Sequence, residues 1–377
     1  MRTAIRHLKE ALRADRHAQE ATAANMDPRS QFSSDGYRYH PLKAVYGLQP
    51  TDRFGTNLLS EIRVFVLQPA PNLKAPIVGS LEIISLNDAW KDRQSSSKTG
   101  FECLSYTWDF GDDARVRFIE VDGRRLRIGG NLHDALPRLR TWYARRLWFD
   151  AICINQQDEA EKTAQVAMMA SIYSLCMWTI IWLGEDTLQQ DGKRSMDLLH
   201  HRPFITLRTL PDCELSIEVD ILEDTEGRSV SLATLLAFLD RRWFSRRWVL
   251  QEVHVSLSHS LRLMCGPYAL YWENFQNSIR YLADIKKGLQ PDLPAVRLAA
   301  LEPPISISGI NEAFDNGLLF VYLEKFRDFK CQDTRDNIAA LSYIVGYTTE
   351  QRPLQIQYDQ SVKANYFRFA RWTLEIV

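Results

Sequence analysis

The feature that most constrains this chain is an alternation of buried strands and amphipathic helices between residues 101 and 184. Short apolar runs at 102–108, 146–152 and 179–183 are typical of strands buried on both faces. Apolar residues recur at helical spacing over 131–139 and 158–176, between these runs. Strands joined by helices pair in parallel through right-handed crossovers. The pattern therefore predicts an α/β fold with a mostly parallel sheet flanked by helices.

The rest of the chain predicts a three-part organisation. The segment before residue 101 is rich in strand patterns, and the pattern from Trp272 onward is helical, interrupted by prolines. We expect an N-terminal helix and linker at 1–36, an α/β domain at 37–290, and a helical C-terminal extension at 291–377 packed on the core. The chain stops within a helical pattern, which indicates a C-terminal truncation.

Composition excludes several classes of protein. The chain has 46 Lys+Arg and 47 Asp+Glu, so it lacks the basic surplus of a nucleic-acid binder. No apolar run reaches the ~20 residues that a membrane-spanning helix needs. Six cysteines without a CxxC pair are typical of reduced thiols in the cytoplasm. No spacing of His and Cys fits a standard metal site, and no nucleotide-binding loop motif occurs, so we predict neither a metal nor a required cofactor.

Polar residues follow two strands that should be neighbours. Asp150 ends the apolar run 146–152, ahead of the polar residues Asn155 and Gln156, while Ser105, Tyr106 and Trp108 end the run 102–108. Ligands of open α/β sheets bind at the carboxyl ends of the strands. We therefore expect all six residues to line a pocket there. The alternative for Asp150 is a carboxylate that only caps its own loop.

The segment RRWFSRRW at 241–248 leads into a helix, predicted over 246–257, that carries Glu252. Trp248 and Glu252 are four residues apart and share one helix face. Glu252 either pairs with one of the arginines or works in a cleft. The mixture of arginine and aromatic residues could indicate nucleic-acid stacking. We favour aromatics entering the core while arginines pair with acids.

Asp158 and Glu161 precede an apolar helix in the spacing of a capping box, in which each side chain satisfies a free backbone N–H. We interpret Glu161 as a structural residue for this reason.

An ordered set of segments resembles the fungal heterokaryon-incompatibility (HET) domain. The segments are YRYHPL at 37–42, IRVFVLQP at 62–69, FECLSYTWDFGD at 101–112, IEVDGRRLRIGGNLHDALPRLR at 119–140, the stretch LWFDAICINQQDEAEKTAQVAMMASIYSLCMWTIIWLG at 147–184, RRWFSRRWVLQEV at 241–253, MCGPYALYWENF at 264–275 and DTRDNIAALSYIV at 333–345. One departure is WDFG at 108–111, where the family usually has Trp-Gly-Asp.

The resemblance implies a cytoplasmic protein of non-self recognition that triggers cell death. HET domains look like distant relatives of the Toll/interleukin-receptor (TIR) fold, and some TIR domains cleave NAD⁺ with a helix-borne glutamate. By that resemblance Glu252 and Asp150 are the candidate catalytic residues, and Ser105, Tyr106, Trp108, Asn155, Gln156 and Trp248 the candidate binding residues. The alternatives are a non-catalytic signalling module that self-associates or binds a partner protein, and an enzyme that uses the same cleft for another small molecule.

Overall fold

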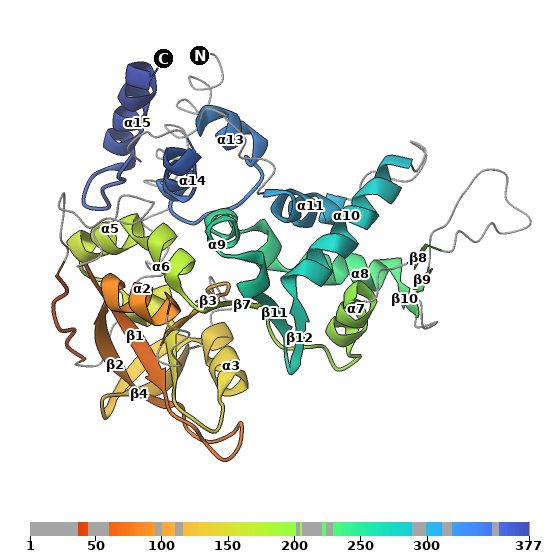
Figure 1. Ribbon diagram of the computed structural model, residues 1–377, viewed down its shortest axis with the longest axis horizontal. Helices are drawn as coiled ribbons and strands as arrows, with labels where there is room; N and C mark the ends of the chain where they lie inside the picture. The colour runs from red at the N-terminus through yellow and green to blue at the C-terminus, as the bar shows by residue number, and fades with distance from the viewer. Residues whose placement is uncertain are drawn as a thin grey trace, which may run out of the picture.

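The α/β fold predicted from the sequence is present in the computed structural model, which is drawn in Figure 1. The structure describes residues 37–43, 60–94, 100–109, 116–200, 204–205, 221–223, 229–288, 299–310, 319–348 and 354–376. The helix expected within residues 1–25 and the linker up to residue 36 lie outside the described residues.

A nine-stranded sheet forms the centre of the molecule, in the order β12-β11-β7-β3-β6-β1-β2-β4-β5. Strands β6, β3, β7 and β11 are parallel to one another, and all the other pairings except β2–β4 are antiparallel. The sheet is therefore mixed, with its parallel strands at the centre. The β-rich N-terminal segment joins this sheet. The strands are β1 (Glu61–Leu67), β2 (Val78–Ser85), β3 (Glu102–Ser105), β4 (Val116–Val121), β5 (Arg124–Gly129), β6 (Arg145–Trp148), β7 (Trp178–Trp182), β11 (Leu261–Cys265) and β12 (Tyr268–Tyr271).

The parallel strands define where a ligand would bind. Numbered along the chain, β3, β6, β7 and β11 lie in the spatial order 2-1-3-4. This is the order of flavodoxin-like doubly wound sheets, in which the connections reverse direction beside the first strand. The carboxyl end of β3, at Ser105, is at that reversal.

Helices surround the sheet, and three of them stack outward from it. Helix α6 packs against α9, and α9 packs against α14, so the C-terminal helices contact the α/β region. In Figure 1 the blue helices α13 to α15 lie beyond α5, α6 and α9. The domain boundaries near residues 36 and 290 stay a prediction. The helices are α2 (Leu86–Gln94), α3 (Gly130–Leu139), α4 (Asp150–Cys153), α5 (Glu159–Ala167), α6 (Met169–Leu175), α7 (Asp191–His200), α8 (Leu232–Leu239), α9 (Val249–Val255), α10 (Trp272–Gly288), α11 (Glu302–Ser308), α13 (Leu319–Lys325), α14 (Asp336–Thr348) and α15 (Val362–Ile376).

A second, three-stranded sheet lies in the insertion that follows β7. Its strands are β8 (Phe204–Ile205), β9 (Ile221–Glu223) and β10 (Ser229–Ser231). Much of this insertion, which the sequence predicted to be irregular, lies outside the described residues.

Three elements end or begin elsewhere than the apolar pattern predicts. The strand expected over 146–152 stops at Trp148, and the chain turns into the short helix α4. The helix expected over 158–176 divides at Met168 into α5 and α6. The helix expected from Arg246 begins at Val249, because Arg246 has extended backbone and pairs with Lys330, far along the chain.

Candidate active site

Two parallel strands and one helix bring the candidate residues together. Strands β3 and β6 end at Ser105 and Trp148, so Tyr106 and Asp150 leave the same edge of the sheet. Helix α9 carries Glu252, and the turn Arg242–Ser245 precedes that helix. The cluster therefore combines residues that are up to 147 positions apart.

Glu252 is held between a hydroxyl and a guanidinium. Its side chain is 2% exposed. Ser105 Oγ donates to Glu252 Oε2, and Arg246 Nη2 donates to Oε1 at 3.3 Å. Trp243 Nε1 in turn donates to Ser105 Oγ at 2.7 Å. Of the two interpretations that the sequence left open, pairing with an arginine is thus the one that the structure shows.

Asp150 lies next to Glu252 but is only partly buried. Trp108 Nε1 donates to Asp150 Oδ1 at 3.1 Å, and Gln156 Nε2 donates to the backbone oxygen of Asp150 at 2.7 Å. Tyr106 is buried beside it, and burial followed by the charge of Asp150 raises the pKa of this tyrosine well above its usual value. Asp150, Trp108, Tyr106 and Gln156 therefore meet at the carboxyl end of the sheet.

One guanidinium serves both carboxylates. Burial raises the pKa of Glu252 and of Asp150, and the positive charge of Arg246 opposes the rise in both. Burial works against the charge of Arg246, but Glu252 and Asp150 together leave the pKa of Arg246 above its usual value. Burial therefore disfavours the ionised form of both acids, and the charge of Arg246 limits that effect.

Two predicted binding residues point away from this cluster. Trp248 Nε1 donates to Asp336 Oδ2 in helix α14 at 3.0 Å. The backbone N–H of Asn155 donates to Glu161 Oε1 at 2.6 Å, and its side-chain oxygen accepts from the backbone of Gln157. The hydrogen bonds of Asn155 thus stay within its own loop and the start of α5, and those of Trp248 reach the C-terminal helices.

The predicted capping box is only half formed. Asp158 accepts from the backbone N–H groups of Ala160 and Glu161, as an N-cap residue should. Glu161 does not reach back to Asp158 and instead forms a buried ion pair with Arg63, at 2.6 Å. This partner lies in β1, 98 positions earlier, so local spacing could not reveal it.

The sequence did not single out three residues that shape the site. Arg246 and Trp243 were present only as members of the RRWFSRRW segment. Asn131 lies in the first turn of α3, where Gly129 is the N-cap residue. Its side-chain nitrogen donates to the backbone oxygen of Thr107 at 2.7 Å, and its oxygen accepts from Trp182 Nε1 at 3.0 Å. Asn131 therefore braces the loop that carries Trp108.

Other chemistry has little support in the part of the chain that the structure describes. No three His, Cys, Asp or Glu side chains there are grouped to hold a metal ion. Burial raises the pKa of Cys153 to about 12, so this thiol is not poised as a nucleophile. No helix among the described residues is long and apolar enough to cross a membrane.

Comparison with known proteins identifies the region that holds the cluster. A family model described as heterokaryon incompatibility protein (HET) matches residues 101–252. Residues 101–252 are thus the part of the chain that is similar to a HET domain. The match begins just before β3 and ends at Glu252, so every residue of the cluster lies in the matched region. Four segments for which the sequence suggested the same resemblance lie outside the matched region, at 37–42, 62–69, 264–275 and 333–345.

One curated relative of the HET domain protein comes from a filamentous fungus. The Neurospora crassa protein described as heterokaryon incompatibility protein 6, OR allele, is 32% identical over 191 residues. The alignment covers 42% of this chain and 28% of the relative. No solved structure matches the chain.

Proposed function

We propose that this chain acts in fungal non-self recognition in the cytoplasm, and that its HET domain cleaves NAD⁺ between nicotinamide and ribose. The name of the Neurospora relative, a heterokaryon incompatibility protein, supports the first part. The second part rests on one observation: the Glu252–Arg246 pair lies at the carboxyl end of β3, where doubly wound sheets bind ligands, close enough for the charge of Arg246 to act on Asp150 as well. The protein needs no cofactor in this proposal, because NAD⁺ is the substrate.

The proposed reaction is a hydrolysis in which the leaving group needs no proton from the protein. The C1′–N1 bond breaks, and its electron pair leaves on the nicotinamide nitrogen, so nicotinamide departs neutral. The ribose carbon becomes oxocarbenium-like and is attacked by water. The products are nicotinamide, ADP-ribose and one proton. A fixed negative charge beside the ribose, shielded from bulk water, stabilises the positive transition state.

The described residues can be given roles in this scheme. Glu252 supplies the negative charge, and a ribose hydroxyl donates to Oε1 beside Arg246, whose side chain is 19% exposed. Asp150 accepts the proton of the attacking water. Its raised pKa brings it closer to the range in which a general base is effective. The half-buried indole of Trp108 forms a wall of the site.

A second function is favoured by the way Glu252 is held. Both oxygens of its carboxylate already have protein partners. A carboxylate whose task is to fix Arg246 and the end of β3 would look the same. In that case the HET domain is a non-catalytic module that signals by self-association or by binding a partner protein.

Mass spectrometry of NAD⁺ incubated with the purified protein separates the two functions. Nicotinamide and ADP-ribose formed in equal amounts, well above a buffer control, are the expected result. Intact NAD⁺ after incubation with folded protein would reject cleavage and leave the signalling module.

A further inference from the structure

Residues 245–247, which lead into α9, are hydrogen-bonded to the C-terminal region. The backbone N–H of Lys330 donates to the oxygen of Ser245 at 2.7 Å, and the N–H of Arg247 donates to the oxygen of Lys330 at 2.8 Å. These two hydrogen bonds form a parallel bridge between Arg246 and Lys330. The backbone of Arg246, the residue that pairs with Glu252, is thus fixed on both sides by one residue of the C-terminal region.

The next residue, Arg247, is anchored in the same region. Its side chain is buried, yet its partners are backbone oxygens and not carboxylates. It donates through Nη1 to the oxygen of Phe326 and through Nη2 to the oxygen of Asn337, the latter at 3.2 Å. Burial lowers the pKa of Arg247 to about 10, so it remains charged at neutral pH. Such an arginine holds the loop before α14 against the start of α9.

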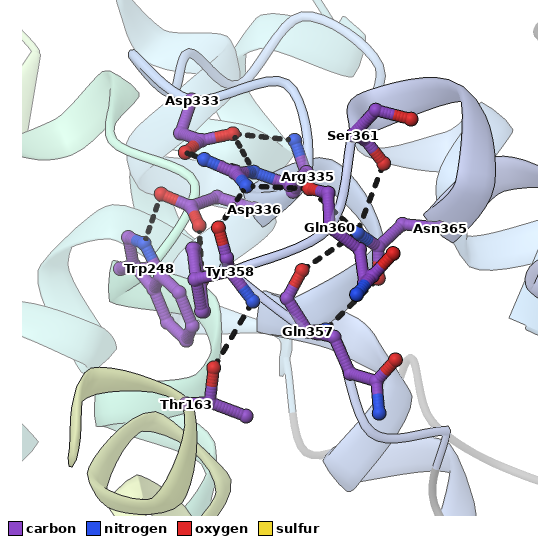
Figure 2. Close-up of polar contacts among 10 residues, drawn as sticks. All are labelled: Thr163, Trp248, Asp333, Arg335, Asp336, Gln357, Tyr358, Gln360, Ser361 and Asn365. Carbon is purple, nitrogen blue, oxygen red and sulfur yellow. Dashed lines mark hydrogen bonds and ion pairs between the residues drawn. The ribbon is translucent and has the colours of Figure 1, made fainter. Parts of the chain in front are cut away.

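The third residue, Trp248, is held by a polar network that Figure 2 shows. Asp336 accepts from Trp248 Nε1 at 3.0 Å and from the hydroxyl of Tyr358 at 2.5 Å. The backbone N–H of Tyr358 donates to Thr163 Oγ1 in α5 at 3.0 Å. Arg335 adds hydrogen bonds to the backbone oxygens of Tyr358 and Gln360, at 2.6 and 2.9 Å.

A backbone hydrogen bond links Trp248 to Glu252. The backbone N–H of Glu252 donates to the oxygen of Trp248 at 3.0 Å, in the first turn of α9. A displacement of the Trp248 backbone therefore moves Glu252 directly. The same displacement would move Arg246, two residues earlier, away from the geometry in which it contacts Glu252.

We propose that the C-terminal region is a positioning part of the HET domain site, in which Asp336, acting through Trp248, and Lys330 and Phe326, acting through residues 245–247, fix Arg246 and Glu252. Only the catalytic test of this proposal rests on the proposed function. The proposal gives residues outside the matched HET region a role in positioning the site.

The test uses two variants that remove hydrogen bonds of Asp336 in the full-length protein. Trp248→Phe keeps an aromatic ring but removes one N–H donor, and Asp336→Ala removes the acceptor of both Trp248 and Tyr358. Asp336→Asn is the conservative partner, because its amide oxygen can still accept from Trp248. Asp328→Ala is the matched control, since that aspartate lies in the same region with a side chain that is 92% exposed.

Hydrogen–deuterium exchange followed by mass spectrometry is the first readout, and it needs no enzyme activity. We expect Trp248→Phe and Asp336→Ala to speed exchange in peptides covering 245–255 by about tenfold or more, without changing peptides from β1. Asp336→Asn and Asp328→Ala should exchange like the original protein. Unchanged exchange at 245–255, or acceleration spread equally through β1, would overturn the proposal.

Turnover of NAD⁺ is the second readout. We expect Asp336→Ala to lower kcat by about 10- to 100-fold with little change in KM, because misplacement of the reacting groups acts on the chemical step. Asp336→Asn should restore most of kcat. A KM effect alone, or no rescue by asparagine, would contradict positioning. If the original protein releases no nicotinamide, the proposed cleavage fails, and the exchange experiment still decides whether the C-terminal region positions α9.

Discussion

Arg246 is the residue on which the charge balance of the site depends. It pairs with Glu252, and its charge also acts on Asp150, while burial disfavours the ionised form of both carboxylates. When both acids are ionised, the three groups carry a net negative charge in a site with little water. Such a charge favours an oxocarbenium-like transition state and disfavours an empty site.

Replacement of Arg246 should therefore destabilise the protein in a pH-dependent way. We expect Arg246→Gln to lower the free energy of unfolding by about 3–5 kcal/mol near neutral pH, since it leaves the buried carboxylate of Glu252 and the partly buried carboxylate of Asp150 without their counter-charge. The folded-state pKa of each acid then rises further above its unfolded value. A raised acid contributes stability that is present below its unfolded pKa and is lost as the pH rises through its folded pKa.

Urea unfolding at acid and neutral pH measures this effect. The loss caused by Arg246→Gln should be smaller at about pH 4.5 than at about pH 7.5. An equal loss at both pH values would mean that Arg246 acts through packing and not through charge.

The sequence predicted part of the candidate site because the end of a strand can be recognised from the residues next to it in the chain. Asp150, Ser105 and Trp108 follow apolar runs, and the carboxyl ends of parallel strands must share an edge. The partner of Glu252 could not be fixed in this way. Four arginines lie between 241 and 247, and only the extended backbone at Arg246 selects one of them for Glu252.

Among the elements, helix α14 carries Asp336, the acid whose raised pKa gives the clearest expected change of stability with pH. Burial, and then the nearby charge of Asp333, raise the pKa of Asp336 to about 6, while Tyr358, Trp248 and Lys162 oppose the rise. Asp333 is itself held ionised by Arg335, because that guanidinium outweighs burial and keeps the pKa of Asp333 below its usual value. Asp336 is thus the member of the pair that takes up a proton first.

This difference predicts how Asp336→Asn changes stability with pH. The folded-state pKa of Asp336 is raised, so its contribution is present below about pH 4 and lost as the pH rises to about 6. Relative to the original protein, Asp336→Asn should gain on the order of 1–3 kcal/mol in free energy of unfolding between pH 4 and pH 7. Urea titrations of both proteins, with Asp328→Asn as control, measure the difference. Parallel stability curves for Asp336→Asn and the original protein would contradict this assignment.

Contacts of individual elements explain why α9 and β6 begin or end at residues other than those predicted from the sequence. Helix α9 starts three residues later than its apolar pattern indicates, because Lys330 holds Arg246 in extended conformation. Strand β6 ends early because the backbone of Phe149 and the side chain of Gln156 close the turn of α4. Periodicity predicts which face of an element is buried, but contacts across the fold decide where the element ends.

On the scale of the whole molecule, the C-terminal helices close one side of the α/β region. Arg247, Trp248 and Thr163 all have hydrogen-bond partners beyond residue 319. A chain that ends at residue 318 would leave the Arg247 guanidinium buried without acceptors or force it into water. Buried polar groups without partners cost about 1–3 kcal/mol each, and more when they are charged.

We therefore expect the shortened chain 1–318 to unfold at a clearly lower urea concentration than the full chain, or to be recovered only as aggregate. Circular dichroism during a urea titration measures the midpoint. A soluble fragment with an unchanged midpoint would show that the C-terminal helices form an independent unit.

The central claim is that Glu252, at the carboxyl end of the sheet, is required for NAD⁺ cleavage by this HET domain. The most direct measurement compares the initial rate of nicotinamide release by the original protein, by Glu252→Gln and by Glu102→Gln. Glu102 is the matched control, because it forms a Glu–Arg pair with Arg145 at the opposite end of β3, at 2.6 Å. We predict release by the original protein and by Glu102→Gln, and a rate at least about 100-fold lower for folded Glu252→Gln. Undiminished release by Glu252→Gln, or an equal loss in both variants, would contradict the account.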